Sequence, residues 1–485
     1  MKGFKRFSSS HLLRLTAFLV IVSCLLLGNT LQATAIENSD QTKKQEIIDL
    51  IVNHHVSGMG KDQLDTKDID TIVASLNDPY TQYFTPDEWK KFLNALENNY
   101  TGIGIRVGSD ETGFFVNEVF TGTPAAEVGM QEGDYIVAVN GTSTKGKTTD
   151  ELISEITGIE GTKVKVKVER DGDKIDFTLT RKQIHIPAIT SRLLDNGIGY
   201  IRISSFSSDA DELFSEQVDA MKKKGMTSFV LDLRDNPGGL LDTAGNMASR
   251  FIKKGNLILT RDRTKVDKPY PLKGKDTLDM PVVVLVNEFS ASASEVLSGA
   301  LQDYKLAKLV GSNTFGKGSV QSLYELNSGG VLKLTIQEYL TPLGNAVNKV
   351  GLKPDIEVIG STPQLLTALQ TAGDINLNLT LSKKGLTING EAFSDSFKVI
   401  RENGMTFVPS RVLAAVVEGE VSWNGKNRSI VIHANNKDIE YSVNSEGVLL
   451  DKGISYIALN RFQTQFRNLA WSDQNDTLSL IENGR

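Results

Sequence analysis

The spacing of apolar residues changes several times along the chain and divides it into segments of different predicted structure. Between residues 40 and 100 the apolar side chains recur at helical intervals. The first group consists of Ile47, Ile48, Ile51 and Val52. A turn at Asn77–Tyr80 interrupts the pattern, and a capping box at Thr85 and Glu88 opens a second helix. The sequence therefore predicts a mainly helical N-terminal region.

Short strands separated by turns are predicted between residues 102 and 182. Lysine alternates with valine from Lys163 to Val168, which predicts a strand with one buried and one solvated face. The dipeptide Asn140-Gly141 is a strong hairpin signal. The other predicted elements are strands at Phe114–Val119, Asp134–Val139 and Ile175–Leu179 and a helix at Thr149–Ile156.

Strands alternate with helices between residues 190 and 360. Phe229–Leu233 and Val282–Val286 are almost continuously apolar, the pattern of strands that are covered on both faces. This segment is predicted to be a mixed α/β core, and a helix at Gln364–Thr371 is expected to link it to the tail.

The tail beyond residue 375 contains a weak internal repeat. Phe407-Val408 and Tyr456-Ile457 are each followed by an arginine, and then by Trp423 and Trp471 at similar distances. The period is about 48 to 50 residues, with two copies. We therefore expect a small α+β repeat module, and the whole chain is predicted to be an α+β multidomain protein.

The first 35 residues have the pattern of an export signal. Positive side chains precede an apolar stretch at Leu15–Gly28, and Ala33-Thr34-Ala35 fits a small-x-small cleavage site. The stretch is shorter than a typical membrane anchor. Three alternatives stay open: a cleaved signal peptide, a retained anchor, and a lipoprotein signal at Cys24. Each would place the protein outside the cytoplasm, either secreted or on the extracytoplasmic face of the cell envelope.

Composition and charge argue against several classes of function. The formal net charge is −6, and no long basic run follows the first 15 residues, which argues against a nucleic-acid partner. Cys24 is the only cysteine, so the rest of the chain has no disulfide and no thiolate metal site. The five histidines, at positions 11, 54, 55, 185 and 433, do not cluster as zinc ligands do. We expect neither a metal nor a cofactor.

The first candidate for catalysis is the segment Asn287–Glu295. It leads from a predicted buried strand into a helix, where a serine hydroxyl is exposed and the helix N-terminus can hold an oxyanion. Ser292 with Glu295 is equally a capping box, so this segment alone leaves a purely structural role open. No histidine lies between residues 190 and 360, so a nucleophile in the α/β core needs another base unless His185, at the domain seam, folds over it.

Two further segments could supply a general base and backbone donors for the oxyanion. Lys317 stands between two glycines in Thr314–Gln321, and a lysine can act as a general base once burial lowers its pKa. The alternative, a phosphate-binding loop, lacks the spacing of a P-loop. Leu233–Gly239 ends in a Pro-Gly-Gly turn whose backbone N–H groups suit an oxyanion, with a plain turn as the alternative.

In their order along the chain, the three segments resemble the corresponding motifs of the carboxy-terminal processing peptidases, also called tail-specific proteases. The motifs are Asp78–Phe84, Arg234–Gly239, Ser290–Glu295 and Phe315–Gly318, and the resemblance covers residues 45 to 360. It implies a serine peptidase with a Ser-Lys dyad. By the same resemblance Ser292 is the nucleophile, Lys317 the general base and Gln321 the residue that orients the lysine. The oxyanion donors would be the backbone N–H groups of Gly238 and Ala293, with Gly239 as a less favoured alternative.

The second segment resembles the PDZ domain of these enzymes. PDZ domains bind a C-terminal peptide by strand addition and hold its carboxylate with backbone N–H groups. The corresponding carboxylate loop consists of Gly102, Ile103, Gly104 and Ile105, and Leu152 and Ile153 would lie on the groove helix. The expected partners are protein or peptide substrates with free, apolar C-termini.

The tail resembles the small module named after the N-terminal domain of copper amine oxidases. Thr406–Arg411 and Val421–Trp423 carry the resemblance, which does not imply copper. Contact with the cell wall through residues 380–485 is left open, as is a homodimer. The predicted organisation is a signal peptide at 1–35, a helical region at 40–100, a PDZ domain at 101–183, a peptidase core at 184–360, a linker at 361–379 and the module at 380–485. The alternatives from other classes are a non-catalytic PDZ adaptor and a cell-wall binding protein.

Overall fold

A computed structural model describes residues 40–109, 112–373, 375–382 and 385–482. The predicted leader, residues 1–35, lies outside this part of the chain. Within it, no helix has both the length and the apolar character needed to cross a membrane. The chain divides into two units, of which the first consists of the residues up to Phe92 together with 261–266 and 319–338, and the second contains the remainder.

The first unit combines the predicted N-terminal helices with a hairpin from much later in the chain. Residues 40–54 are helical, and the unit also contains a 3₁₀ turn at Lys61–Gln63, α2 (Ile69–Ala74), β1 (Gln82–Phe84), β17 (Ser319–Glu325) and β18 (Val331–Leu340). Ile47 and Ile51 pack with Leu332 of β18 in one buried cluster. β1 pairs antiparallel with β18, with Phe84 opposite Val331. A strand of three residues is too short to show alternation, so the helical prediction for this region missed β1.

The capping box predicted at Thr85 and Glu88 is confirmed. The Glu88 carboxylate accepts hydrogen bonds from the backbone N–H and the hydroxyl of Thr85, at 2.9 and 2.8 Å. Helix α3 (Pro86–Leu96) begins directly after Thr85, which is the place that a proline at the first helical position favours.

In the second unit, residues 99–185 form a small β domain with two helices. Its elements are β2 (Asn99–Gly102), β3 (Ile105–Ser109), β4 (Phe114–Val119), α4 (Pro124–Glu127), β5 (Tyr135–Val139), β6 (Thr142–Ser143), α5 (Thr149–Ile156), β7 (Lys163–Arg170), β8 (Asp173–Thr180) and β9 (Lys182–His185). The predicted hairpin is confirmed, since Asn140 and Gly141 both have positive φ between the paired strands β5 and β6. The valines of β7 are buried and the lysines between them are more exposed, as the alternation predicts.

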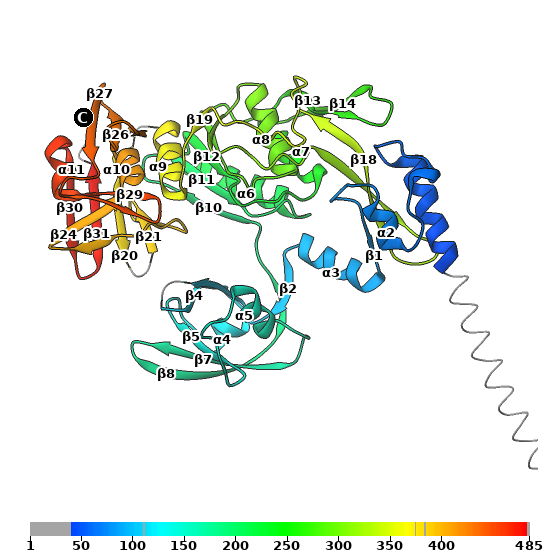
Figure 1. The fold of residues 1–485 in the computed structure, drawn as a ribbon, viewed down its shortest axis with the longest axis horizontal. Coiled ribbons are helices and arrows are strands. Elements are labelled where there is room, and N and C mark those ends of the chain that lie inside the picture. Colours follow the sequence, from blue (N-terminus) through cyan, green and yellow to red (C-terminus); the bar gives the residue numbers. More distant parts are fainter. Residues whose placement is uncertain (1–39, 110–111, 374, 383–384, 483–485) are drawn as a thin grey trace, which may run out of the picture. The chain divides into compact units, whose positions relative to one another are not determined.

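The α/β core is built on a six-stranded sheet in the order β10-β11-β12-β15-β16-β19 (Figure 1). Its strands are β10 (Ile189–Leu193), β11 (Ile198–Ile203), β12 (Ser228–Asp232), β15 (Val282–Val286), β16 (Lys308–Gly311) and β19 (Ile356–Glu357). Only the β10–β11 pair in this order is antiparallel. β13 (Lys254–Arg261) and β14 (Asp267–Lys273) are neighbours in another sheet.

Helices cover both faces of the core sheet, as its apolar strands predict. They are α6 (Ala210–Lys223), α7 (Leu241–Ala248), α8 (Ala293–Asp303) and α9 (Ser361–Ala372). Phe229 of β12 contacts the ring of Phe214 on α6, whereas its neighbour Val230 lies in the cluster that contains Leu365 and Leu369 of α9. Helix α9, which falls within the expected linker 361–379, therefore packs on the core sheet.

The tail forms the predicted two-copy module, and the described fold is α+β throughout. Its elements are β20 (Asn378–Ser382), β21 (Gly385–Ile388), β22 (Glu391–Phe393), β23 (Ile400–Glu402), β24 (Met405–Pro409), α10 (Ser410–Val416), β25 (Glu420–Asn424), β26 (Ser429–Ala434), β27 (Lys437–Ser442), β28 (Val448–Asp451), β29 (Ile454–Ala458), α11 (Leu459–Gln465), β30 (Leu469–Gln474) and β31 (Thr477–Glu482). Each copy runs strand, helix, strand, strand. The two first strands, β24 and β29, pair with each other, with Val408 opposite Ile457.

Candidate active site

Ser292 occupies a strained turn between a buried strand and a helix. β15 is buried along its whole length, and α8 begins at Ala293, directly after Ser292. The backbone of Ser292 has φ 57° and ψ −116°. A residue with a β-carbon pays about 1–3 kcal/mol in such a region and stays there only when its surroundings hold it. A serine on a sharp strand-to-helix turn is the arrangement of many hydrolase nucleophiles.

The three serines of the predicted nucleophile segment have different surroundings. Ser290 and Ser294 are fully buried. Their hydroxyls donate to the backbone carbonyls of Leu233 and Asn236, at 2.8 and 2.9 Å. Ser292, which lies between them, is partly exposed. The outer serines therefore hold the turn at 233–239 against α8, and the middle one is accessible to a substrate.

The carboxylate of Glu295 joins the turn at Ser292 to the lysine loop, the segment Thr314–Gln321 that contains Lys317. Glu295 is 1% exposed, and its two oxygens accept four hydrogen bonds. Oε2 accepts from the backbone N–H groups of Ser292 and Lys317, at 2.9 and 2.8 Å. Oε1 accepts from the Thr314 hydroxyl and the Gly316 N–H, at 2.6 and 2.7 Å. These four bonds fill the acceptor capacity of a carboxylate. Glu295, the glutamate of the predicted capping box, therefore fixes the backbone at Ser292 and the backbone of the lysine loop together.

The two glycines beside Lys317 are required by close backbone contacts. A β-carbon on Gly318 would lie 2.3 Å from the backbone nitrogen of Asn348, and one on Gly316 would lie 2.9 Å from that of Gly351. The carbonyl of Gly316 also accepts from the Lys349 N–H at 2.8 Å. The lysine loop is thus held on both sides, and Lys317 itself is partly exposed.

The Arg-Asp-Asn-Pro-Gly-Gly turn lies directly against Ser292. It follows β12, which is parallel to β15, so both connections leave the sheet at the same edge. A β-carbon on Gly238 would lie 2.8 Å from Cβ of Ser292 and 2.9 Å from the backbone nitrogen of Ala293. Both predicted oxyanion residues, Gly238 and Ala293, are therefore next to the candidate nucleophile.

The Gly238 amide already has a partner in this structure. It donates to Oδ1 of Asn236 at 2.8 Å. Asn236 is fully buried, and its side-chain amide donates to the carbonyl of Ile203 at 2.9 Å. Its own backbone carbonyl accepts from the Ala291 N–H at 3.0 Å. Asn236 thus connects the turn, the core sheet and the serine segment, a role that the sequence analysis did not assign.

An apolar groove in the β domain brings together most of the predicted peptide-binding residues. It is lined by Tyr100, Ile103, Gly104, Ile105, Arg106, Val107, Phe120, Ile153, Ile156, Thr157 and Ile186. Of the predicted loop, Gly102 is not part of this lining. Ile153 of α5 faces the groove, whereas Leu152 is completely buried in the domain core. Burial raises the pKa of Tyr100 to about 12, so its phenol is neutral at physiological pH.

The backbone of the predicted carboxylate loop is oriented by the segment that follows β4. The carbonyl of Ile103 accepts from the Ala125 N–H at 2.8 Å, and that of Gly104 accepts from the Phe120 N–H at 3.0 Å. In a trans peptide the next N–H points opposite to the carbonyl. The N–H groups of Gly104 and Ile105 therefore point away from residues 120–125.

Comparisons with known proteins show which family the chain belongs to. The model of Peptidase family S41 matches residues 197–358, the PDZ domain model matches 91–169, and the copper amine oxidase N-terminal domain model matches 339–432 and 387–459. A curated relative from Staphylococcus aureus (strain COL), "Probable CtpA-like serine protease", is 32% identical over 436 residues, which are 87% of this chain and 88% of the relative. The chain belongs to peptidase family S41.

A second curated relative and a solved structure are also similar to this chain. A "Probable CtpA-like serine protease" from Staphylococcus epidermidis is 34% identical over 354 residues, which are 72% of each chain. Among solved structures, the photosystem II D1 C-terminal processing protease is 27% identical, covers 66% of this chain and 93% of its own, and has a TM-score of 0.45. From the family models and the curated relatives, the chain is an S41 serine peptidase with a PDZ domain, and both domains suit peptide substrates.

Gln321, the third predicted S41 site residue, belongs to the first unit. It lies on β17, where a bulge follows Val320. Its side-chain amide donates to the hydroxyls of Ser319 and Thr335, at 2.9 and 3.2 Å. The hydrogen bonds of the Gln321 amide in this structure are thus made to hydroxyls of the first unit. The other predicted site residues all belong to the second unit: Ser292, Lys317, Gly238 and Ala293.

Each histidine of the described chain has partners outside the S41 site. His54 stacks on Tyr324, His55 pairs with Asp78, and His185 pairs with Asp209. His433 of β26 lies between Ser422 of β25 and Asp438 of β27, with its Nε2 2.6 Å from Ser422 Oγ and its Nδ1 2.7 Å from Asp438 Oδ1. Sequence reasoning missed this Ser-His-Asp arrangement, because its members meet only through strand register. Among the described residues, no group of three or more metal-ligating side chains occurs.

Proposed function

We propose that this S41 peptidase is an exported endopeptidase that cleaves peptide bonds with a Ser292–Lys317 dyad. The observation that carries the proposal is the shared carboxylate oxygen of Glu295, which receives the backbone N–H groups of both residues. Two loops held by one buried carboxylate cannot shift independently. A nucleophile and a base need this kind of fixed relation, because proton transfer depends on their mutual placement.

In the proposed reaction, the neutral Lys317 amine removes the proton of the Ser292 hydroxyl as its oxygen attacks the substrate carbonyl carbon. The resulting oxyanion would be held by the Ala293 N–H at the start of α8 and by an N–H of the turn at 238–239. For Gly238 this requires that its bond to Asn236 be exchanged for one to the oxyanion; Gly239 is the alternative donor. Lys317 then returns the proton to the leaving amine, and water releases the acyl group. Gln321 would orient the lysine.

The groove of the PDZ domain is proposed to receive the free C-terminus of the substrate. An extended peptide would add to β3 beside α5, with its apolar side chain among Ile103, Ile153 and Ile156. Its carboxylate would be held by the N–H groups of Gly104 and Ile105. The leader pattern at 1–35 supports export, so we propose action outside the cytoplasm.

Substitution of the dyad tests this function against the alternative of a non-catalytic PDZ adaptor. Ser292→Ala and Lys317→Ala should each abolish hydrolysis of fluorescently labelled casein with the thermal unfolding midpoint retained. Gln321→Ala should have a milder effect. Ser290→Ala and Ser294→Ala are matched controls, which should lower stability because each removes one of the hydrogen bonds to a buried carbonyl, yet keep measurable activity.

Several outcomes would contradict the dyad. Lys317→Ala with more than about a tenth of the activity would exclude a lysine base, since loss of a true base removes most of the rate. Residual activity in Ser292→Ala that disappears with His433→Ala would move the chemistry to the C-terminal module. Inhibition by EDTA that zinc reverses would exclude a metal-independent mechanism.

A further inference from the structure

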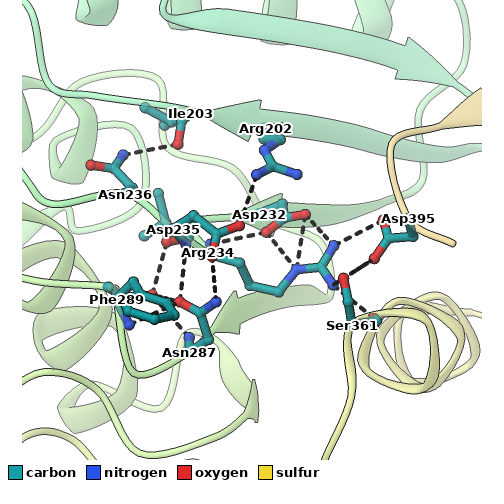
Figure 2. A network of polar contacts seen from close by, with 12 residues as sticks. Arg202, Ile203, Asp232, Arg234, Asp235, Asn236, Asn287, Phe289, Ser361 and Asp395 are labelled. Carbon is teal, nitrogen blue, oxygen red and sulfur yellow. Dashed lines mark hydrogen bonds and ion pairs between the residues drawn. The ribbon is translucent and has the colours of Figure 1, made fainter. Parts of the chain in front are cut away.

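Arg234, within the Arg-Asp-Asn-Pro-Gly-Gly turn, is a buried cation held between two carboxylates (Figure 2). Its side chain is 2% exposed. Its Nη2 donates to Asp232 at 2.6 Å, and its Nε contacts both oxygens of the same carboxylate, at 3.0 and 3.2 Å. On the other side, Nη1 and Nη2 donate to the two oxygens of Asp395, at 2.9 and 3.2 Å. The guanidinium therefore joins the end of β12 to a residue of the C-terminal module.

The second carboxylate is itself firmly placed. Asp395 lies in the connection between β22 and β23 and is 5% exposed. The hydroxyl of Ser361, at the start of α9, donates to Asp395, and the Ser361 carbonyl accepts from Arg234 Nη1 at 2.8 Å. Nearby, Thr362 donates to the Ser396 carbonyl at 3.0 Å, and Phe393 packs edge-on against Tyr200 of β11. The segment around Asp395 is thus docked on the core.

Charge balance supports a fixed arrangement of these groups. Burial alone would raise the pKa of Asp232, but the Arg234 guanidinium and the Tyr200 hydroxyl hold it below its usual range. Burial alone would lower the pKa of Arg234, and the two aspartates raise it instead. Asp232 and Arg234 are therefore ionised at neutral pH. A buried charge that loses one partner is costly, so the guanidinium is held where both carboxylates can reach it.

The position of Arg234 is transmitted to the nucleophile through its immediate neighbours. The Leu233 carbonyl accepts from the Ser290 hydroxyl, and Asp235 exchanges two hydrogen bonds with Asn287, at 2.9 and 2.8 Å (Figure 2). Gly238, four residues after Arg234, lies so close to the serine segment that a β-carbon on it would be 2.8 Å from the Cβ of Ser292. A shift of the turn at 233–239 would therefore displace the proposed oxyanion donor Gly238 first, and peptide binding in the groove of the PDZ domain would be affected less directly.

We propose that Asp395 of the C-terminal module is a positioning residue for the catalytic turn, acting through Arg234. The inference rests on the proposed placement of the oxyanion site between α8 and the turn at 233–239. It gives the module a role inside the peptidase, since Asp395 and Ser361 complete the support of a turn that belongs to the core. Binding of any partner to the module could then alter catalysis through this one contact.

The test compares Asp395→Asn with a matched substitution in the same module. Asp395→Asn places an amide donor against the guanidinium, at nearly unchanged size. The control is Asp473→Asn, because Asp473 forms a comparable bidentate pair with Arg401, at 2.8 and 2.8 Å, wholly within the module. In the full-length protein we would measure kcat and KM for labelled casein, the rate at which a fluorophosphonate labels Ser292, and the unfolding midpoint.

The expected result is a fall of at least about tenfold in kcat and in the labelling rate for Asp395→Asn, with KM nearly unchanged, because misplacement of a catalytic group acts on the chemical step. Asp473→Asn should keep the wild-type rate. Unchanged kcat in a folded Asp395→Asn protein would overturn the proposal. So would an equal fall in both variants that follows their unfolding midpoints, because it would show a loss of module stability only.

A second variant keeps the test decisive if Asp395→Asn fails to fold. Ser361→Ala removes the hydroxyl that donates to Asp395 and accepts from Arg234 Nη1. It should lower kcat severalfold with KM retained, and a wild-type kcat would again reject the proposal. Ser292→Ala is measured in parallel. Activity in that variant would refute the proposed dyad, whereas normal activity in Asp395→Asn and Ser361→Ala would refute only the role of the module.

Discussion

The backbone N–H groups of Ser292 and Lys317 donate to the same oxygen atom, Oε2 of Glu295, over 2.9 and 2.8 Å. The two residues are 25 positions apart and lie on different loops, so this atom links the two loops directly. The strained backbone of Ser292 and the glycine-flanked backbone of Lys317 are therefore stabilised together. The first two predictions concern this link.

Glu295→Gln should disrupt the site without changing its size. The glutamine amide turns one acceptor oxygen into a donor that faces N–H groups, and a lost hydrogen bond to a charged group costs about 1.5–3 kcal/mol. Activity should fall by about 100-fold or more, since small misplacements of catalytic groups have effects of this order. Unfolding midpoints and casein hydrolysis would measure both. The control is Glu288→Gln, which removes an exposed partner of Ser312.

The backbone of Ser292 predicts an inverted order of stability at this position. In ordinary helical positions alanine is more stabilising than glycine by about 1 kcal/mol. At 292 the positive φ should reverse the order, so that Ser292→Gly is more stable than Ser292→Ala by about 1 kcal/mol, although neither is active. Urea unfolding of both variants measures this. Ser298, in the middle of α8, provides the comparison with the usual order, and the usual order at 292 would show that its conformation is not strained.

In the PDZ domain, substitutions at Gly104 and Gly122 would distinguish the effect of a steric clash from the effect of backbone strain. Both have positive φ, but a β-carbon at 104 would lie 2.1 Å from the Cβ of Thr123, whereas at 122 nothing lies within 4 Å. Gly122→Ala should cost about 1–2 kcal/mol and keep peptide binding. Gly104→Ala should cost more and abolish binding of a peptide with a free C-terminus, as measured by fluorescence anisotropy. Equal effects of the two changes would exclude a special role for Gly104.

A peptide with a free, apolar C-terminus should stimulate cleavage of an unrelated substrate, because ligand binding in the groove favours one domain arrangement. The effect should be of order 1–3 kcal/mol, the usual range for coupling between sites. Amidation of the peptide should remove it, since the loop N–H groups then lose their anion. Equal stimulation by the amide would show that the loop does not recognise a carboxylate. The rate of casein hydrolysis is the measurement.

Asp78 should make the first unit sensitive to acid. Burial alone would raise the pKa of this carboxyl, but hydrogen bonds from His55, Thr335 and Thr81 lower it well below the ordinary value of 3.8. A carboxyl with a lowered pKa stabilises the fold above its unfolded pKa and loses this effect as the pH falls through its folded pKa. Asp78→Asn should therefore be less stable than wild type at pH 7, and the difference should shrink below pH about 4.

Unfolding free energies measured against pH test this expectation for Asp78. The control is Asp87→Asn, at an exposed position in the first turn of α3. Asp87→Asn should follow the wild-type curve across the whole range. A constant difference between Asp78→Asn and wild type down to the acid limit would mean that the carboxyl contributes no pH-dependent stability.

Local patterns predicted most of the fold but only part of the site. Alternation predicted β7, the apolar run predicted β15 and the capping residues predicted α3, because each depends on neighbours in sequence. The capping box of Ser292 and Glu295 was also visible, but the bonds from Thr314 and Gly316 to Glu295 depend on tertiary structure. The same holds for Arg234 and Asp395, whose contact joins residues 161 apart in the chain. The glycine-flanked position of Lys317 made it a candidate base, and the choice of this residue as the proposed base rests on the resemblance to a known family.

The pairing of β1 with β18 has a consequence for the order in which the chain folds. Gln82 lies opposite Lys333, and the helix at 40–54 packs its isoleucines on the same late hairpin. During synthesis the N-terminal segment therefore emerges long before the strand that completes its sheet. Closing so large a loop is slow, and unpaired apolar segments are prone to aggregate in the meantime. The N-terminal segment therefore stays without its partner strand until residues 331–340 have been made, and a chaperone that binds it would protect the nascent chain during this interval.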